Sequence, residues 1–178
     1  EALSVLGYAM LPLYARALNL PDDYFDPHFT RPTWWTRNAY YPAIEPQDNQ
    51  FGISPHSDHG FITLLPMSDV TGLEILSPRG EWISATPVKN GIIVNTGEFL
   101  NRWSNGRFLA TPHRVVPPKK DRYSMAMFFN PNPDTLAVPL ESCVSPENPA
   151  VFEPVTMIDY MGWYIDNNYK REAGGSQE

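Results

Sequence analysis

Residues 56–65 read HSDHGFITLL, and this segment decides how the rest of the chain is interpreted. It opens with a histidine and an aspartate two positions apart, His56 and Asp58, and continues into residues typical of a strand. In extended chain, side chains at positions i and i+2 lie on the same face. Two ligands from this segment can therefore meet at one metal ion.

A third metal ligand must come from elsewhere, and His113 is a candidate later in the chain. Two histidines and one carboxylate form the facial triad of non-haem Fe(II) oxygenases, which leaves three coordination positions open. Each motif alone is weak, because a histidine beside an aspartate is more often an ordinary surface pair. We assign structural roles to His28, which precedes the strands, and to His59, whose parity differs from that of His56.

Short strand-like segments surround the motif. They are separated by Pro, Gly, Asn and Asp, a spacing typical of a β-sandwich or barrel. The chain contains 19 prolines among 178 residues, which argues against a helical bundle. The predicted strands are 34–41, 61–67, 72–76, 82–86, 92–95, 108–116, 123–130 and 135–139.

Helices are predicted at both ends of the chain. An apolar stripe predicts a helix over 2–20, with a kink or break at Pro12, and a short second helix starts at Pro21. Thr156 and Asp159 have the spacing of a capping box and predict a last helix over 157–171, followed by a flexible tail.

Composition limits the partners. The net charge of −7 disfavours nucleic acid and anionic membrane surfaces, and no apolar run approaches the ~20 residues of a membrane helix. The single cysteine, Cys143, excludes an intrachain disulfide and favours a reducing compartment, so we expect a cytoplasmic protein.

A possible anion clamp follows the second histidine of the triad. Arg122 and Ser124 share one face of a predicted strand, and arginine binds carboxylates through two parallel hydrogen bonds. The same short motif occurs at Arg102 and Ser104, where a turn signal follows, so we expect Arg102 to face solvent or to cap that turn.

Taken together, these motifs resemble the isopenicillin N synthase-like Fe(II)/2-oxoglutarate-dependent oxygenases. Their order and spacing match over more than half of the chain. The matching segments are 40–42 (YYP), 56–65 (HSDHGFITLL), 72–75 (GLEI), 82–83 (WI), 94–98 (VNTGE), 104–106 (SNG), 113–115 (HRV) and 122–124 (RYS).

The resemblance implies a mainly β fold, a double-stranded β-helix or jelly-roll barrel, with flanking helices. We therefore divide the chain into a helical lead-in at 1–33, a jelly-roll oxygenase core at 34–156, and a C-terminal helix and tail at 157–178. The resemblance assigns the iron ligands to His56, Asp58 and His113.

The resemblance also implies 2-oxoglutarate as co-substrate. Its far carboxylate would be bound by Arg122 and Ser124, with a further hydrogen bond from Tyr41. Two positions depart from the family pattern. Ala39 stands where the family often has Asn, and Glu98 stands where it usually has Asp, so we expect Glu98 to be structural or to support the ligands.

The implied activity is oxidation of a small organic substrate by O₂, with release of succinate and CO₂. One alternative is an oxidase of the same fold that uses no 2-oxoglutarate, in which Arg122 and Ser124 hold a substrate carboxylate. The other is a jelly-roll binding module without catalysis, although all three metal ligands are present. Family members carry a segment ahead of the first helix. We therefore expect this chain, which begins at Glu1 rather than Met, to lack such a segment of the same protein.

Overall fold

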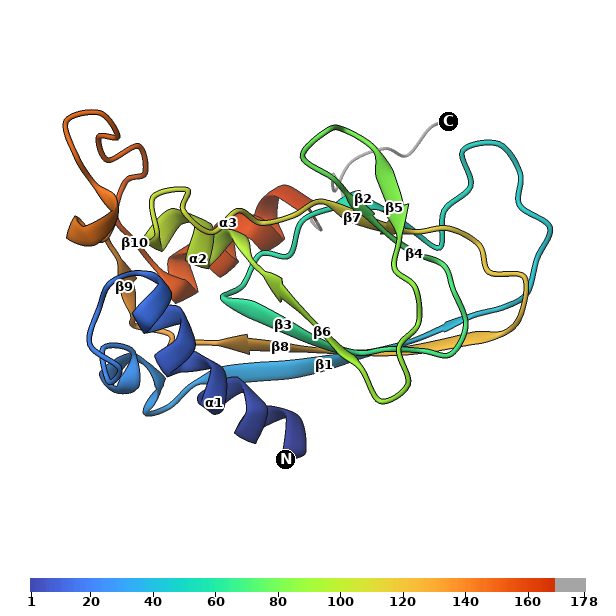
Figure 1. Cartoon of the computed structure of the whole chain (residues 1–178), viewed down its shortest axis with the longest axis horizontal. Helices are drawn as coiled ribbons and strands as arrows, with labels where there is room; N and C mark the ends of the chain where they lie inside the picture. Colours follow the sequence, from blue (N-terminus) through green and yellow to red (C-terminus); the bar gives the residue numbers. More distant parts are fainter. Residues whose placement is uncertain (169–178) are drawn as a thin grey trace, which may run out of the picture.

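The computed structural model describes residues 1–168 and forms a barrel of two four-stranded sheets (Figure 1). In both sheets, strands distant in sequence are neighbours, as in a jelly roll. This confirms the predicted fold. The first sheet has the order β1 (Thr33–Tyr41), β8 (Arg122–Asn130), β3 (Ile62–Pro66) and β6 (Ile92–Thr96). The second has the order β2 (Ile53–His56), β7 (His113–Val115), β4 (Leu73–Leu76) and β5 (Trp82–Ser84).

Strands β1 and β8 form the longest antiparallel pair, with a register that runs from Thr33 opposite Asn130 to Tyr41 opposite Arg122. Alternation along both strands turns one set of side chains into the barrel and the other outward. Tyr40 and Tyr123 belong to the outward set, where their exposed rings stack 5.0 Å apart. The inward set lines the cavity described below.

Helix α1 (Ala2–Ala17) lies across the outer face of the first sheet and contacts β3 and β8 (Figure 1). It continues through Pro12 without the predicted break. Proline removes one helical hydrogen bond. Packing of the apolar face can outweigh that loss, because helices in proteins are stabilised mainly by such contacts. Leu11 and Ala15, on either side of Pro12, are buried in the core.

Several predicted boundaries were wrong. The second helix begins later than Pro21 and is only a 3₁₀ turn, η1 (Asp26–Phe29). The strand predicted over 108–116 shrinks to β7, because Pro112 and Pro117 flank it and proline cannot donate to a strand ladder. The strand predicted over 135–139 shrinks to β9 (Leu136–Ala137).

Four elements were not predicted as such: strand β2, helix α2 (Glu98–Trp103), the 3₁₀ turn η2 (Glu141–Cys143), and strand β10 (Val155–Thr156), which pairs with β9. Helix α3 (Met157–Asn168) follows β10 directly. Its start is confirmed: the Thr156 hydroxyl accepts from the Asp159 backbone N–H at 3.2 Å and donates to the Asp159 carboxylate at 2.6 Å. Residues 169–171 of the prediction, and the predicted tail, lie outside the described residues.

The main core lies between the outer face of the first sheet and the helices that pack on it. Its largest side chains are aromatic, and each is at most 2% exposed: Phe25, Phe29, Phe61, Phe99, Trp103 and Phe129. No helix within residues 1–168 combines the length and the apolar character that crossing a bilayer requires.

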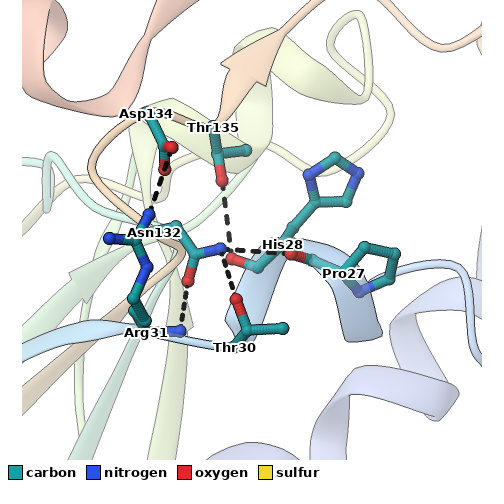
Figure 2. Close-up of polar contacts among 7 residues, drawn as sticks. All are labelled: Pro27, His28, Thr30, Arg31, Asn132, Asp134 and Thr135. Carbon is teal, nitrogen blue, oxygen red and sulfur yellow. Dashed lines mark hydrogen bonds and ion pairs between the residues drawn. The ribbon is translucent and has the colours of Figure 1, made fainter.

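A polar network centred on Asn132 ties the segment before β1 to the segment after β8 (Figure 2). The Asn132 carboxamide accepts from the backbone N–H of Arg31 at 2.6 Å and donates to the carbonyl of Pro27 at 3.1 Å. Its own backbone N–H donates to the carbonyl of His28 at 2.7 Å. These bonds satisfy buried polar groups where the chain enters and leaves the long strand pair.

Candidate metal centre and adjoining cavity

His56, Asp58 and His113 come together at one end of the barrel. His56 ends β2, His113 begins β7, and the two residues are directly paired across these strands. One potential ligand atom from each of the three residues lies within 4.8 Å of the others. The geometry therefore gathers the three residues that the sequence nominated as metal ligands.

The two histidine rings are oriented by backbone carbonyls. Nδ1 of His56 lies 2.8 Å from the carbonyl oxygen of Ser54, and Nδ1 of His113 lies 3.1 Å from that of Thr111. When Nδ1 carries the proton and donates to these carbonyls, Nε2 is left with its lone pair for a metal. Burial lowers the pKa of His56, which favours the neutral form that binds metal.

The carboxylate of Asp58 completes the donor set. Its Oδ1 lies 3.7 Å from Nε2 of His113, and its Oδ2 is buried without a hydrogen-bond partner. A buried, unpartnered carboxylate oxygen is costly unless a cation or donor meets it. Two imidazole nitrogens and this carboxylate therefore fit a divalent transition metal.

Glu98 supports this end of the barrel from the start of α2. Its backbone N–H donates to the carbonyl of Asp58 at 2.8 Å, and its Oε1 accepts from the Ser57 hydroxyl at 2.8 Å. Its Oε2 accepts from the Asn101 carboxamide at 2.9 Å. Glu98 thus contacts the residues that carry the metal ligands rather than the ligand atoms themselves.

A cavity that is partly open to solvent joins the three candidate ligands to Arg122; we call it the central cavity. Both sheets contribute to its walls. The apolar part of its lining includes Ile53, Leu65, Leu73 and Val115. Tyr41 and Ser124 line the same space, so the structure brings together all six residues that the sequence nominated.

Arg122 is a buried cation without a counter-ion. It is 4% exposed, its Nε and Nη1 have no hydrogen-bond partner, and no carboxylate within residues 1–168 forms an ion pair with it. Burial lowers its pKa, yet a guanidinium remains charged at neutral pH. Its Cζ lies 5.1 Å from the centre of the Tyr41 ring, a cation–π contact. Such a group calls for an anionic ligand in the central cavity.

The prediction that Arg102 faces solvent or caps the following turn was wrong. Its guanidinium carbon lies 5.0 Å from the ring centre of Phe152 and 5.6 Å from that of Tyr160, and its Nη2 donates to the carbonyl of Glu153 at 3.3 Å. Arg102 therefore contacts the segment leading into α3 and that helix itself. Because α2 was not predicted, nothing in the sequence indicated this direction.

His28 has the structural role that was expected, since its ring packs 4.9 Å from Trp103 in an edge-to-face contact. His59 lies outside the triad, but the parity argument for it was wrong because β2 already ends at His56. Its ring stacks against Trp35 and Phe128, at centroid distances of 5.7 and 5.6 Å.

Two further residues of the central cavity, Arg37 and Phe128, were missed as site residues. A signal for Arg37 was present, because it has the same parity as Tyr41 along the strand predicted over 34–41. Phe128 has the same relation to Arg122 along β8.

Comparison with known proteins places this arrangement in a family. The family model described as the 2OG-Fe(II) oxygenase superfamily matches residues 33–131. The chain is 31% identical to a 2-oxoglutarate-Fe(II) type oxidoreductase, hxnY, of Emericella nidulans, with 100% of this chain and 52% of that protein covered. It is 33% identical to 1-aminocyclopropane-1-carboxylate oxidase 1 of Oryza sativa, with coverage of 94% and 54%.

A solved structure agrees. The crystal structure of a full-length Neurospora crassa protein in complex with alpha-KG and thymine superimposes with a TM-score of 0.87 and 30% identity, covering 93% of this chain and 53% of that one. The chain spans about half the length of these relatives. The family match covers more than half of the 178 residues, from β1 to just beyond β8. The chain therefore belongs to the 2OG-Fe(II) oxygenase superfamily.

Proposed function

We propose that the chain forms the catalytic barrel of an Fe(II)- and 2-oxoglutarate-dependent oxygenase acting on a small organic substrate. One observation carries the proposal: a single cavity joins a two-histidine, one-carboxylate cluster to a buried arginine that lacks a counter-ion. The first feature fits Fe(II), and the second fits the far carboxylate of a dicarboxylate bound at the metal.

The proposed ligand roles follow from the donor set. His56, Asp58 and His113 would hold Fe(II) on one face, which leaves the remaining positions for co-substrate and O₂. Fe(II) with 2-oxoglutarate supplies oxidation of a C–H bond coupled to decarboxylation, with succinate and CO₂ as products. Of the two oxygens of Asp58, Oδ2 has no competing partner, so it is available to the cation.

At the other end of the central cavity, Arg122 and Ser124 would bind the far carboxylate, and Tyr41 would donate a further hydrogen bond. Arg122 and Ser124 project from the same face of β8, and Tyr41 is opposite Arg122 on β1. Arg122 is buried, and a charge-assisted hydrogen bond to a ligand is stronger in such a low-dielectric environment. Ala39, opposite Ser124, adds no polar contact of its own.

The extent of the unit is part of the proposal. Residues 34–156 would form the oxygenase core, with 1–33 and the C-terminal segment from 157 packing around it. We also place the protein in the cytoplasm, since its cysteine, Cys143, is buried with a free thiol, as is usual in reducing compartments.

Anaerobic calorimetry tests the proposal. The Fe(II)-loaded protein should bind 2-oxoglutarate, and admission of O₂ with a substrate panel should release one succinate per substrate oxidised. A protein that holds Fe(II) but neither binds 2-oxoglutarate nor releases succinate would contradict it.

One relative favours a second candidate. Because the chain is 33% identical to a plant 1-aminocyclopropane-1-carboxylate oxidase, an oxidase without 2-oxoglutarate is the alternative. In that case Arg122 and Ser124 would hold a carboxylate of the substrate itself. Product formation without succinate would identify this activity.

A further inference from the structure

Arg37 is a second arginine without a counter-ion, and it lies at the exposed mouth of the central cavity. No ion pair of its guanidinium occurs within residues 1–168. The chain has a net charge of −7, and three of its other arginines do pair with carboxylates. These pairs are Arg16 with Asp22, Arg31 with Asp134, and Arg114 with Glu74.

The register fixes where Arg37 stands. Arg37 is opposite Ala126 in the β1–β8 pair. Trp35, two residues earlier on the same face of β1, is opposite Phe128. Arg37 and Phe128 line the same cavity as the candidate metal ligands. A ligand bound between the metal centre and the mouth would therefore meet the positive charge of Arg37 and the ring of Phe128.

The aromatic surface extends beyond Phe128. The rings of Trp35, His59 and Phe128 lie 5.4–5.7 Å apart with interplanar angles of 13–25°. The ring of Tyr164, from α3, lies 4.3 Å from that of His59 at 25°. These near-parallel faces suit offset stacking with another planar ring.

A hollow that is open to solvent extends from Trp35 and His59 toward α3. We call it the aromatic hollow, and its lining consists of Trp35, His59, Met161, Tyr164 and Ile165. These side chains are aromatic or aliphatic and carry no charged group apart from the His59 ring when it is protonated. The hollow therefore suits an apolar body rather than a sugar or a phosphate.

We propose that the primary substrate is a planar-ring carboxylate, with its ring against the aromatic hollow and its carboxylate on Arg37. This inference rests on the proposed function, because it places the substrate beside the metal centre of that function. It adds Arg37 and Trp35 as residues that determine specificity. Ring and charge are both needed: Arg37 alone would accept any anion, and the hollow alone any apolar ring.

Arg37 and Arg122 have separate tasks in this arrangement. Arg122 is 4% exposed and is reached through the cavity, whereas Arg37 is exposed at the mouth. The buried arginine suits the far carboxylate of a small co-substrate that stays within the barrel. The exposed arginine suits a larger molecule that enters from solvent and extends toward α3.

Calorimetry on the anaerobic protein loaded with Fe(II) and 2-oxoglutarate tests this inference. The probes are phenylacetate, 3-phenylpropanoate and 2-naphthylacetate, the primary amide of each, and hexanoate as a carboxylate without a ring. The variants are Arg37→Met, Arg37→Lys and Trp35→Leu. Arg79→Met is the matched control, because Arg79 is exposed in the turn between β4 and β5, away from the cavity.

We expect at least one aryl carboxylate to bind about tenfold more tightly than its amide, the lower end of the range for charge-assisted hydrogen bonds. Arg37→Met should remove that preference, Arg37→Lys should restore part of it, and Arg79→Met should leave it unchanged. Trp35→Leu should weaken binding of the aryl carboxylate several-fold and that of hexanoate by less than about twofold, since only the ring loses its stacking partner.

Equal affinity of the unmodified protein for every acid and its amide, or no binding of either, would overturn the inference without any variant. Equal behaviour of Arg37→Met and Arg79→Met would overturn the role of Arg37. Failure of the proposed function looks different, because 2-oxoglutarate itself then fails to bind before any probe is added.

Discussion

Two regions of the molecule carry the same three-residue motif and use it differently. In β8, Arg122 and Ser124 both line the central cavity, and the buried guanidinium has no carboxylate partner within residues 1–168. At the end of α2, Arg102 contacts Phe152 and the neighbouring segment, while Ser104 is fully buried.

Secondary structure explains the difference. In a strand, residues i and i+2 point to the same face, so an arginine and a serine can act on one ligand. Along a helix the same two residues are about 200° apart and point in different directions. An Arg-x-Ser motif therefore predicts an anion site only when its segment is known to be extended.

We expect the largest effect at the metal ligands, which line the same cavity as Arg122. Asp58→Ala should weaken Fe(II) binding by more than the 10- to 100-fold typical of losing an outer-shell partner, because it removes the one anionic ligand. Asp48→Ala, in an exposed loop, is the control. Iron content per chain measures the effect. Normal iron content in Asp58→Ala would refute the assigned donor set.

The next largest effect separates the two arginines directly. Arg122→Leu should weaken 2-oxoglutarate binding about 10- to 150-fold, because charge-assisted hydrogen bonds contribute roughly 1.5–3 kcal/mol. Iron binding should persist, since Arg122 is not among the metal donors. Titration of the Fe(II)-loaded variant measures the change. An affinity within twofold of the unmodified protein would contradict the role of Arg122 and favour the oxidase that uses no 2-oxoglutarate.

These two predictions depend on residues that the sequence identified by itself. His56, Asp58, His113, Arg122 and Ser124 were nominated from their motifs, Tyr41 was nominated by the family resemblance, and all six line one cavity. The His-x-Asp and Arg-x-Ser pairs could be found because, in extended chain, side chains two positions apart point to the same face. The jelly-roll topology came from the family resemblance, since no local pattern specifies which distant strands become neighbours.

What the sequence missed has physical causes. Helix α2 is six residues long, too short for a periodic apolar pattern to identify. Without it, the contacts of Arg102 could not be foreseen. His59 was misplaced because the strand argument was extended past His56, where β2 ends. Of the kink or break expected at Pro12, the break is absent, because tertiary packing keeps α1 continuous.

The structural arginine should show a smaller effect of a different kind. Arg102→Leu should leave 2-oxoglutarate affinity within about twofold. It should lower stability by roughly 1 kcal/mol, because contacts with Phe152 and Tyr160 are lost, each worth about 0.5–1 kcal/mol. For a chain of this size, that is a fall of about 2–4 °C in Tm. Thermal unfolding and a 2-oxoglutarate titration measure the two quantities. A loss of co-substrate affinity without a change in Tm would contradict the assignment.

The smallest expected effects concern the two serines of the motif, Ser124 and Ser104. Ser124→Ala should weaken 2-oxoglutarate binding about 2- to 10-fold, because a neutral hydrogen bond contributes roughly 0.5–1.5 kcal/mol. Ser104→Ala should not change that affinity. Its hydroxyl accepts from the Phe108 backbone N–H at 3.0 Å and donates to the Asn101 carbonyl at 3.3 Å, so its loss should instead cost about 1 kcal/mol of stability.

Both serine variants remove a single oxygen atom, so each is the control for the other. Titration with 2-oxoglutarate and chemical unfolding should separate them: Ser124→Ala changes affinity, and Ser104→Ala changes the midpoint of unfolding. Ser124 is half-buried against the cavity, whereas Ser104 is 0% exposed in the core. If Ser124→Ala changed the midpoint of unfolding and left the affinity unchanged, the motif in β8 would be structural as well. The unpaired charge of Arg122 would then need another explanation than a bound co-substrate.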